Sequence, residues 1–222
     1  GDQKFNLIIK EIENKEDLDS FHYLENFHYR THSIIESEYD EAFLKKEGGG
    51  GSKRAVLICY IKYGNRQIPA GYVQLEQPLQ MVKPRHVALN RPFKSKKHDA
   101  EWEEWKLNEI KKYVNQIVRI ARIVTSPEFR GIGLSSIMIN HAKIFANERW
   151  HIKGRPPIFM EIMAEMLKYM DFVSRSGFYY MGETMGNSMR FKEDMKAMKR
   201  GQKKDAFGMM SLQEQYKVRI DK

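Results

Sequence analysis

SPEFRGIGLSS, residues 126–136, joins a short apolar run to a segment with helical spacing. The run before it, residues 118–124 (VRIARIV), is rich in β-branched residues and ends near Pro127, which predicts a strand that stops at the proline. Hydrophobic residues after it recur every three or four positions up to about Trp150, which predicts a helix. The glycines of the stretch therefore lie on a strand-to-helix turn.

A turn of this kind exposes main-chain N–H groups at the positive end of the helix dipole, where an anion can bind. Gly131 and Gly133 leave room for a phosphate to approach the main chain, and Arg130 would add a charged donor. The spacing is neither GxGxxG nor a Walker loop, because no GK[ST] follows. The residues alone leave two interpretations open, a phosphate-binding turn and an ordinary helix start.

The composition sets broader limits. A chain of 222 residues with 41% hydrophobic content can fill one core, and we predict one α/β domain. No apolar run approaches about 18 residues and no signal-peptide pattern is present, so we expect neither a membrane span nor secretion. A single cysteine, Cys59, excludes an internal disulfide and favours a reducing, cytoplasmic location. The formal charge of +9 favours a polyanionic partner, either nucleic acid or a phosphate-rich cofactor.

One segment has an artificial composition. Residues 48–52 (GGGGS) match an engineered flexible linker and supply neither core nor turn chemistry. We infer that the linker replaces a natural loop between Lys46 and Lys53.

The remaining pattern predicts strands and helices in mixed order. Strands are expected at residues 5–12, 55–63, 68–75, 118–124 and 158–163, and helices at residues 16–26, 99–116, 134–150 and 165–175. Residues 76–98, with several prolines, are expected to form a loop, and residues 178–181 and 189–191 a closing hairpin. The basic tail, residues 192–222, includes a candidate last strand at residues 216–220.

PEFRGIGLS resembles the acetyl-CoA-binding motif of the GNAT N-acetyltransferase superfamily, R/Q-x-x-G-x-G/A. Arg130, Gly133 and Ser135 stand at its fixed places, and the serine departs from the usual Gly or Ala. The order of predicted elements is similar as well, up to the pair Gly177-Phe178. The resemblance implies a single GNAT-like domain at residues 2–191, with a mixed central sheet, a splayed parallel pair, flanking helices and a Trp-containing insertion at residues 83–116.

A closer likeness is to GNAT-like modules attached to ABC-type ATPase sequences. It is carried by FHYR at residues 27–30, LNE at residues 107–109 and MAEMLKY at residues 163–169. The His-Tyr pair is also similar to one in the phage DNA-modifying Mom protein, a GNAT-like enzyme that acts on adenine. These likenesses imply an ABC-type ATPase and nucleic acid as candidate partners.

The resemblance implies a site for CoA and a set of reacting groups. The CoA pyrophosphate would bind at Arg130, Gly131, Ile132, Gly133, Leu134 and Ser135, and the pantetheine arm would pair with Ile123, Val124 and Thr125. Acyl transfer also needs a base, an oxyanion donor and an acid for the leaving thiolate. The candidates for the base are Glu161, Glu165 and His28, and those for the acid are Tyr169, Ser174 and Tyr29. The position of the family's tyrosine acid is occupied by Val173, which cannot donate a proton, and no metal site is expected.

Three functions follow from this interpretation. The first is an acyl-CoA-dependent N-acyltransferase that moves an acetyl group from acetyl-CoA to an amine. The second keeps the fold and modifies a base of a nucleic acid, which must be unstacked to enter the site. The third is a non-catalytic module that binds CoA or a partner within an ATPase-linked assembly.

Overall fold

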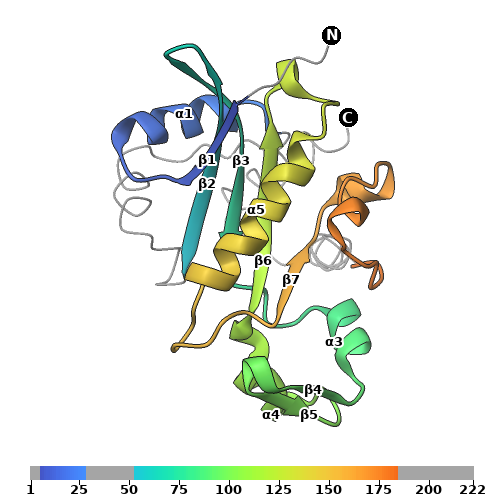
Figure 1. Ribbon diagram of the computed structural model, residues 1–222. Coiled ribbons are helices and arrows are strands. Elements are labelled where there is room, and N and C mark those ends of the chain that lie inside the picture. The colour runs from blue at the N-terminus through green and yellow to red at the C-terminus, as the bar shows by residue number, and fades with distance from the viewer. Residues whose placement is uncertain (1–5, 29–52, 185–222) are drawn as a thin grey trace, which may run out of the picture. The chain divides into compact units, whose positions relative to one another are not determined.

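A five-stranded mixed sheet forms the centre of the fold in the computed structural model (Figure 1). The structure describes residues 6–28 and 53–184. The chain divides into two units, residues 1–181 and 182–222, and the elements below belong to the first.

The sheet has the strand order β1-β2-β3-β6-β7. Neighbouring strands are antiparallel from β1 to β6, and β6 and β7 are parallel. Its strands are β1 (Asn6–Glu11), β2 (Arg54–Tyr63), β3 (Arg66–Glu76), β6 (Ile117–Thr125) and β7 (Phe159–Ile162). The predicted α/β fold with a mixed sheet is confirmed, and each predicted strand of this sheet is found within a few residues of its expected bounds.

Two helices cover opposite faces of the sheet. Helix α1 (Lys15–Glu25) is preceded by its N-cap residue Asn14, whose side chain accepts a hydrogen bond from the Asp17 N–H group. Helix α5 (Leu134–Arg149) packs on the other face. Successive strand residues point to opposite faces, so Leu57 contributes to the core under α5 and Ile58 to the core under α1.

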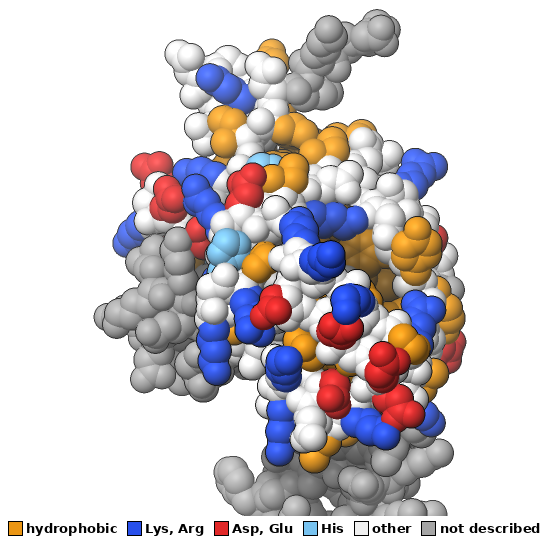
Figure 2. Space-filling view, turned by 60° about the horizontal axis from the view of Figure 1, so that its bottom comes forward, with side chains coloured by type: hydrophobic (Ala, Val, Ile, Leu, Met, Phe, Trp, Pro, Cys, Tyr) orange, Lys and Arg blue, Asp and Glu red, His pale blue; other side chains and the backbone are white. Residues whose placement is uncertain are grey.

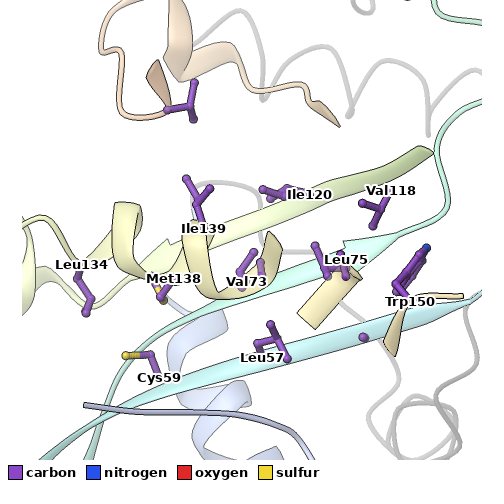
Figure 3. Packing of buried hydrophobic residues seen from close by; sticks show 14 of the residues in the cluster. Leu57, Cys59, Val73, Leu75, Val118, Ile120, Leu134, Met138, Ile139 and Trp150 are labelled. Carbon is purple, nitrogen blue, oxygen red and sulfur yellow. The ribbon is translucent and has the colours of Figure 1, made fainter. Parts of the chain in front are cut away.

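The core beneath α5 explains one glycine. Figure 3 shows Met138, Ile139 and Trp150 packed over the strand side chains of this cluster. A Cβ on Gly71 would lie 2.5 Å from the Val124 carbonyl oxygen and 3.0 Å from Met138 Cε. Only glycine lets β3 approach β6 this closely at that position.

The Trp-containing insertion has its own aromatic core, and its expected structure was wrong in part. The expected loop at residues 76–98 contains α3 (Lys83–Leu89) and β4 (Phe93–Ser95). The expected helix at residues 99–116 is divided among β5 (Ala100–Trp102), α4 (Leu107–Tyr113) and the 3₁₀ turn η3 (Val114–Gln116), and η2 (Lys96–His98) precedes it. Trp102 stacks on Phe93 across the β4–β5 pair, with ring centroids 4.3 Å apart, so a cross-strand contact overrides the helical pattern.

The segment after β7 also differs from its prediction. The expected helix at residues 165–175 is replaced by two 3₁₀ turns, η5 (Glu165–Lys168) and η6 (Ser174–Ser176). Residues 178–181 form no strand within the described part. The linker and the strands expected at residues 189–191 and 216–220 lie outside the described residues. Among the helices that are described, none is long and apolar enough to cross a bilayer.

Candidate functional site

The turn between β6 and α5 has the open geometry that its glycines suggested. After a short 3₁₀ turn, η4 (Pro127–Phe129), the chain passes through Gly131 and Gly133 at φ +84° and +83°. Residues other than glycine rarely adopt this left-handed region of backbone angles. A Cβ on either glycine would meet no atom within 4 Å, so the backbone angle requires glycine here and crowding does not. Gly133 is the N-cap of α5, and no side chain caps this helix.

Consecutive main-chain N–H groups are left without a partner at this turn. The Arg130 N–H group donates to Pro127, and the Gly133 carbonyl accepts from Ser136 and Ile137. Within the described residues no hydrogen bond takes up the N–H groups of the next five positions, which are Gly131, Ile132, Gly133, Leu134 and Ser135. Such a run at a helix start is a physical basis for anion binding. Leu134 is buried in the core and fixes the helix behind the turn.

Arg130 lies at the edge of this turn. Its Nε donates to the Thr125 carbonyl at 3.2 Å, and the side chain is exposed. The predicted group of turn residues is therefore brought together with the end of β6.

The second half of β6 has a free edge. Pairing between β6 and β7 stops at Ile120 and Ile162, whereas β6 continues to Thr125. In Figure 1 the two strands lie side by side at their starts and separate toward their ends. The Ser126 N–H group donates to the carbonyl of Ala70 in β3, so by alternation the main-chain groups of Ile123 and Thr125 point to the opposite edge. No described strand pairs with that edge of residues 121–125.

A β-bulge marks the point where the free edge begins. Gln74 pairs with Arg122 and Leu75 with Ile120, which leaves Ala121 as the extra residue on β6. A bulge bends its strand, increases the local twist and is frequent beside functional sites. Its position next to the end of the β7 pairing fits the separation of the two strands.

On the α1 face a carboxylate lies against this part of β6. Glu25, the last residue of α1, accepts hydrogen bonds from the Tyr72 hydroxyl and from Arg122 Nη1, the latter at 2.5 Å. Tyr72 is fully buried, and burial followed by the nearby Glu25 carboxylate raises its pKa. The predicted His28 follows shortly after α1, and its N–H group donates to the Glu25 carbonyl at 3.0 Å. Tyr29 lies outside the described residues.

Glu161 is part of a buried ion pair. It is 4% exposed, and Arg85 Nη1 lies 2.9 and 3.1 Å from its two carboxylate oxygens. Burial raises the pKa of Glu161, while Arg85 and Arg119 act in the opposite direction. Arg85 also donates to the carbonyl groups of Leu79 and Gln80. These bonds favour a structural role for Glu161, which joins α3 to β7, over its predicted role as the base.

The candidate acid Tyr169, the candidate base Glu165 and Val173, at the position of the family's acid, occupy different environments. Tyr169 is 82% exposed, and its hydroxyl makes no hydrogen bond with a described residue. Glu165 begins η5. Val173 is buried and belongs to the core beneath α5, so its side chain fills space in the fold.

Sequence reasoning missed the residues that surround Glu25. Arg122 carried a recognisable signal, because it is a charged residue within the apolar run of residues 118–124. Glu25 immediately precedes the segment that includes His28, but its partners are far away in the sequence. Nothing in the sequence pattern indicated Tyr72 or Arg85 as residues near the candidate site.

No family model matches the chain, and no curated protein matches it at a significant level.

Proposed function

We propose that this protein is an acyl-CoA-dependent N-acyltransferase of the GNAT type that transfers an acetyl group from acetyl-CoA to an amine. The observation that carries the proposal is the run of N–H groups at residues 131–135 that are unbonded within the described residues, at the start of α5 and directly after the free half of β6. This combination would offer an anion site and a strand edge on neighbouring segments of the chain.

The residues fit the chemical parts of CoA. The diphosphate would be held by the main-chain N–H groups of residues 131–135, with Arg130 as a charged donor beside them. The free main-chain groups of Ile123 and the N–H group of Thr125 match the amides of the pantetheine arm, which can bond to them as a further strand would. When bound, CoA supplies the thioester, and the protein aligns it for attack by an amine.

Calorimetric titration with CoA tests the binding site. Gly133→Val should abolish binding, because valine blocks the approach to the turn and resists φ +83°. Gly154→Val is the matched control, since Gly154 also has a positive φ, +76°, and open space around it. It should bind CoA as the wild type does. Equal affinity of the Gly133 variant and the wild type would refute the site.

A nucleic-acid substrate is the second candidate, and the surface over the insertion favours it. Figure 2 shows Lys and Arg side chains spread over the face that includes this part of the molecule, with Asp and Glu among them. The formal charge of the whole chain is +9. Binding of a DNA or RNA oligonucleotide should then weaken steeply between 50 and 200 mM salt, as about 6–10 phosphate contacts would produce. No binding at low salt would exclude this candidate.

Mass spectrometry of the purified protein under native conditions separates binding from catalysis. Retained CoA, together with acetylation of an amine, protein or nucleic acid, supports the transferase. Retained CoA without turnover on any of them would support a non-catalytic module, alone or beside an ABC-type ATPase.

A further inference from the structure

The geometry of the sheet decides on which side an amine would meet the thioester, if CoA binds as proposed. Helix α5, whose start would hold the diphosphate, packs on the face that carries Val73 and Ile120. Helix α1 packs on the opposite face, with Tyr72 and Val124. A pantetheine arm that passes along the free edge of β6 leads from the first face toward the second. An amine that approaches the thioester from the other side therefore arrives on the α1 face.

On the α1 face, a carboxylate–arginine pair lies on each side of the bulge at Ala121. Glu76 is bonded to Arg119 at 2.6 Å, and Arg119 lies opposite Glu161 where β6 and β7 are paired. Glu25 is bonded to Arg122 at 2.5 Å, beyond the last residue that pairs with β7. Only the second pair lies beside the free half of the strand.

The two carboxylates also differ in their remaining capacity to accept hydrogen bonds. Both oxygens of Glu76 are engaged, Oε2 by Arg119 and Oε1 by Gln74 and Arg54. Among the residues that the structure describes, each oxygen of Glu25 has one donor, Tyr72 on Oε1 and Arg122 on Oε2. A carboxylate oxygen can accept two hydrogen bonds, so Glu25 has room for a further donor on each oxygen, whereas Glu76 has room on Oε2 alone. Its side chain is 19% exposed, whereas that of Glu161 is 4% exposed.

We propose that Glu25 binds the acceptor amine and takes its proton during acyl transfer. The amine nitrogen forms a bond to the thioester carbonyl carbon, the carbon–sulfur bond breaks, and the electron pair leaves with the CoA thiolate. One N–H proton passes to the Glu25 carboxylate and then to solvent, and the thiolate takes a proton from solvent. Tyr72 and Arg122 are positioning residues, because each fixes one carboxylate oxygen.

The test needs neither turnover nor the natural amine. It compares the affinities of S-(2-aminoethyl)-CoA, whose ammonium group lies near the position of an attacking amine, and S-propyl-CoA, which has the same length and no charge. The wild type should bind the aminoethyl compound about tenfold more tightly, as one charge-assisted hydrogen bond allows. Glu25→Gln should bring the ratio close to one and leave the affinity for CoA itself unchanged.

Glu76→Gln is the matched control, because it changes a carboxylate on the same face with similar exposure, 22%, and an arginine partner. This variant should keep the wild-type ratio of affinities for the aminoethyl and propyl compounds. The inference is overturned if the wild type shows no preference, if Glu25→Gln retains it, or if Glu76→Gln loses it equally. Failure of CoA itself to bind the wild type would overturn the proposed function as well, whereas CoA binding without a charge preference would overturn only the role of Glu25.

Discussion

The first half of β6, residues 117–120, pairs with β7 along its whole length, whereas β3 is the one described strand that pairs with the second half, residues 121–125. The first half carries Arg119, which lies between Glu76 and Glu161 in the register of the sheet. The second half carries Arg122 and ends at the glycine turn.

We infer from this difference that the paired half of β6 contributes to stability and the free half to ligand binding. In the paired half the charged groups are matched across neighbouring strands and the main-chain groups are used in the sheet. In the free half one edge of the strand is available, and the N–H groups that follow it at residues 131–135 are unbonded within the described part. Changes in the paired half should therefore act on folding, and changes near the free half on ligand binding.

The largest effect is expected from Arg85→Leu, which breaks the ion pair that anchors the paired half. It leaves Glu161 buried without its partner, so the free energy of unfolding should fall by about 3–5 kcal/mol. The double variant Arg85→Leu/Glu161→Leu should recover most of this loss, because no uncompensated charge remains. Urea unfolding measures both values. A loss below about 1 kcal/mol in the single variant would contradict the structural role of the pair.

Gly71→Ala should have the next largest effect, because Gly71 lies on β3 opposite Thr125, where β3 and β6 are paired. The added methyl group would lie 2.5 Å from the Val124 carbonyl oxygen, so β3 and β6 must move apart. We expect a loss of about 1–3 kcal/mol in unfolding free energy, as for other overpacked sites. Urea unfolding measures the loss. A loss below about 0.5 kcal/mol would show that the close approach does not matter.

Acid should lower the stability of the insertion, because His86 becomes protonated. Trp105 Nε1 donates to His86 Nδ1 at 2.9 Å, and the Val82 N–H group lies 3.3 Å from Nε2. Burial and then Arg85 lower the pKa of His86 below its ordinary value near 6.5. The folded state thus binds fewer protons than the unfolded state, so the contribution of His86 is complete above about pH 6.5 and declines as the pH falls below it.

The measurement is urea unfolding at several pH values between 7.5 and 5, monitored by tryptophan fluorescence. His98 also has a pKa lowered by burial, so His98→Gln serves as the background in which His86→Gln is compared. The acid sensitivity should decrease when His86 is removed. An unchanged pH dependence would exclude His86 as its source.

The smallest effect on stability is expected from Arg130→Ala, at the end of the free half. The one hydrogen bond of its side chain within the described residues is an exposed contact with Thr125, so the free energy of unfolding should change by about 0.5 kcal/mol or less. The affinity for CoA should nevertheless fall about tenfold, because a charged donor beside the diphosphate is lost. Unfolding and calorimetry on the same variant separate the two effects. Unchanged CoA affinity would remove Arg130 from the site.

The sequence was informative where structure is local. The strand, glycine turn and helix at residues 118–150 follow from spacing and from the backbone angles that glycine permits, and the structure has all three. The prediction of one helix at residues 99–116 was wrong. Its acidic start and lysine-rich end fit a helix locally, but the stacking of Trp102 on Phe93 favours a strand pair.

The contacts around the candidate site could not be predicted in the same way. Glu25 and Arg122 are 97 positions apart, and Arg85 and Glu161 are 76 apart. Neither pair has a spacing that a helix or a hairpin would bring together. Their meeting depends on the strand order of the sheet, which one sequence does not encode in a local pattern.

The most direct test of the central claim is the amide NMR spectrum of the protein during titration with CoA. The N–H groups of Gly131 and Gly133, at the start of α5, have no hydrogen-bond partner in the described part of the chain, and their signals should shift strongly as the diphosphate binds. Gly64 and Gly154 share the positive φ but lie in other turns, and their signals should stay in place. Saturable CoA binding with no change at Gly131 and Gly133 would place the ligand elsewhere and contradict the claim.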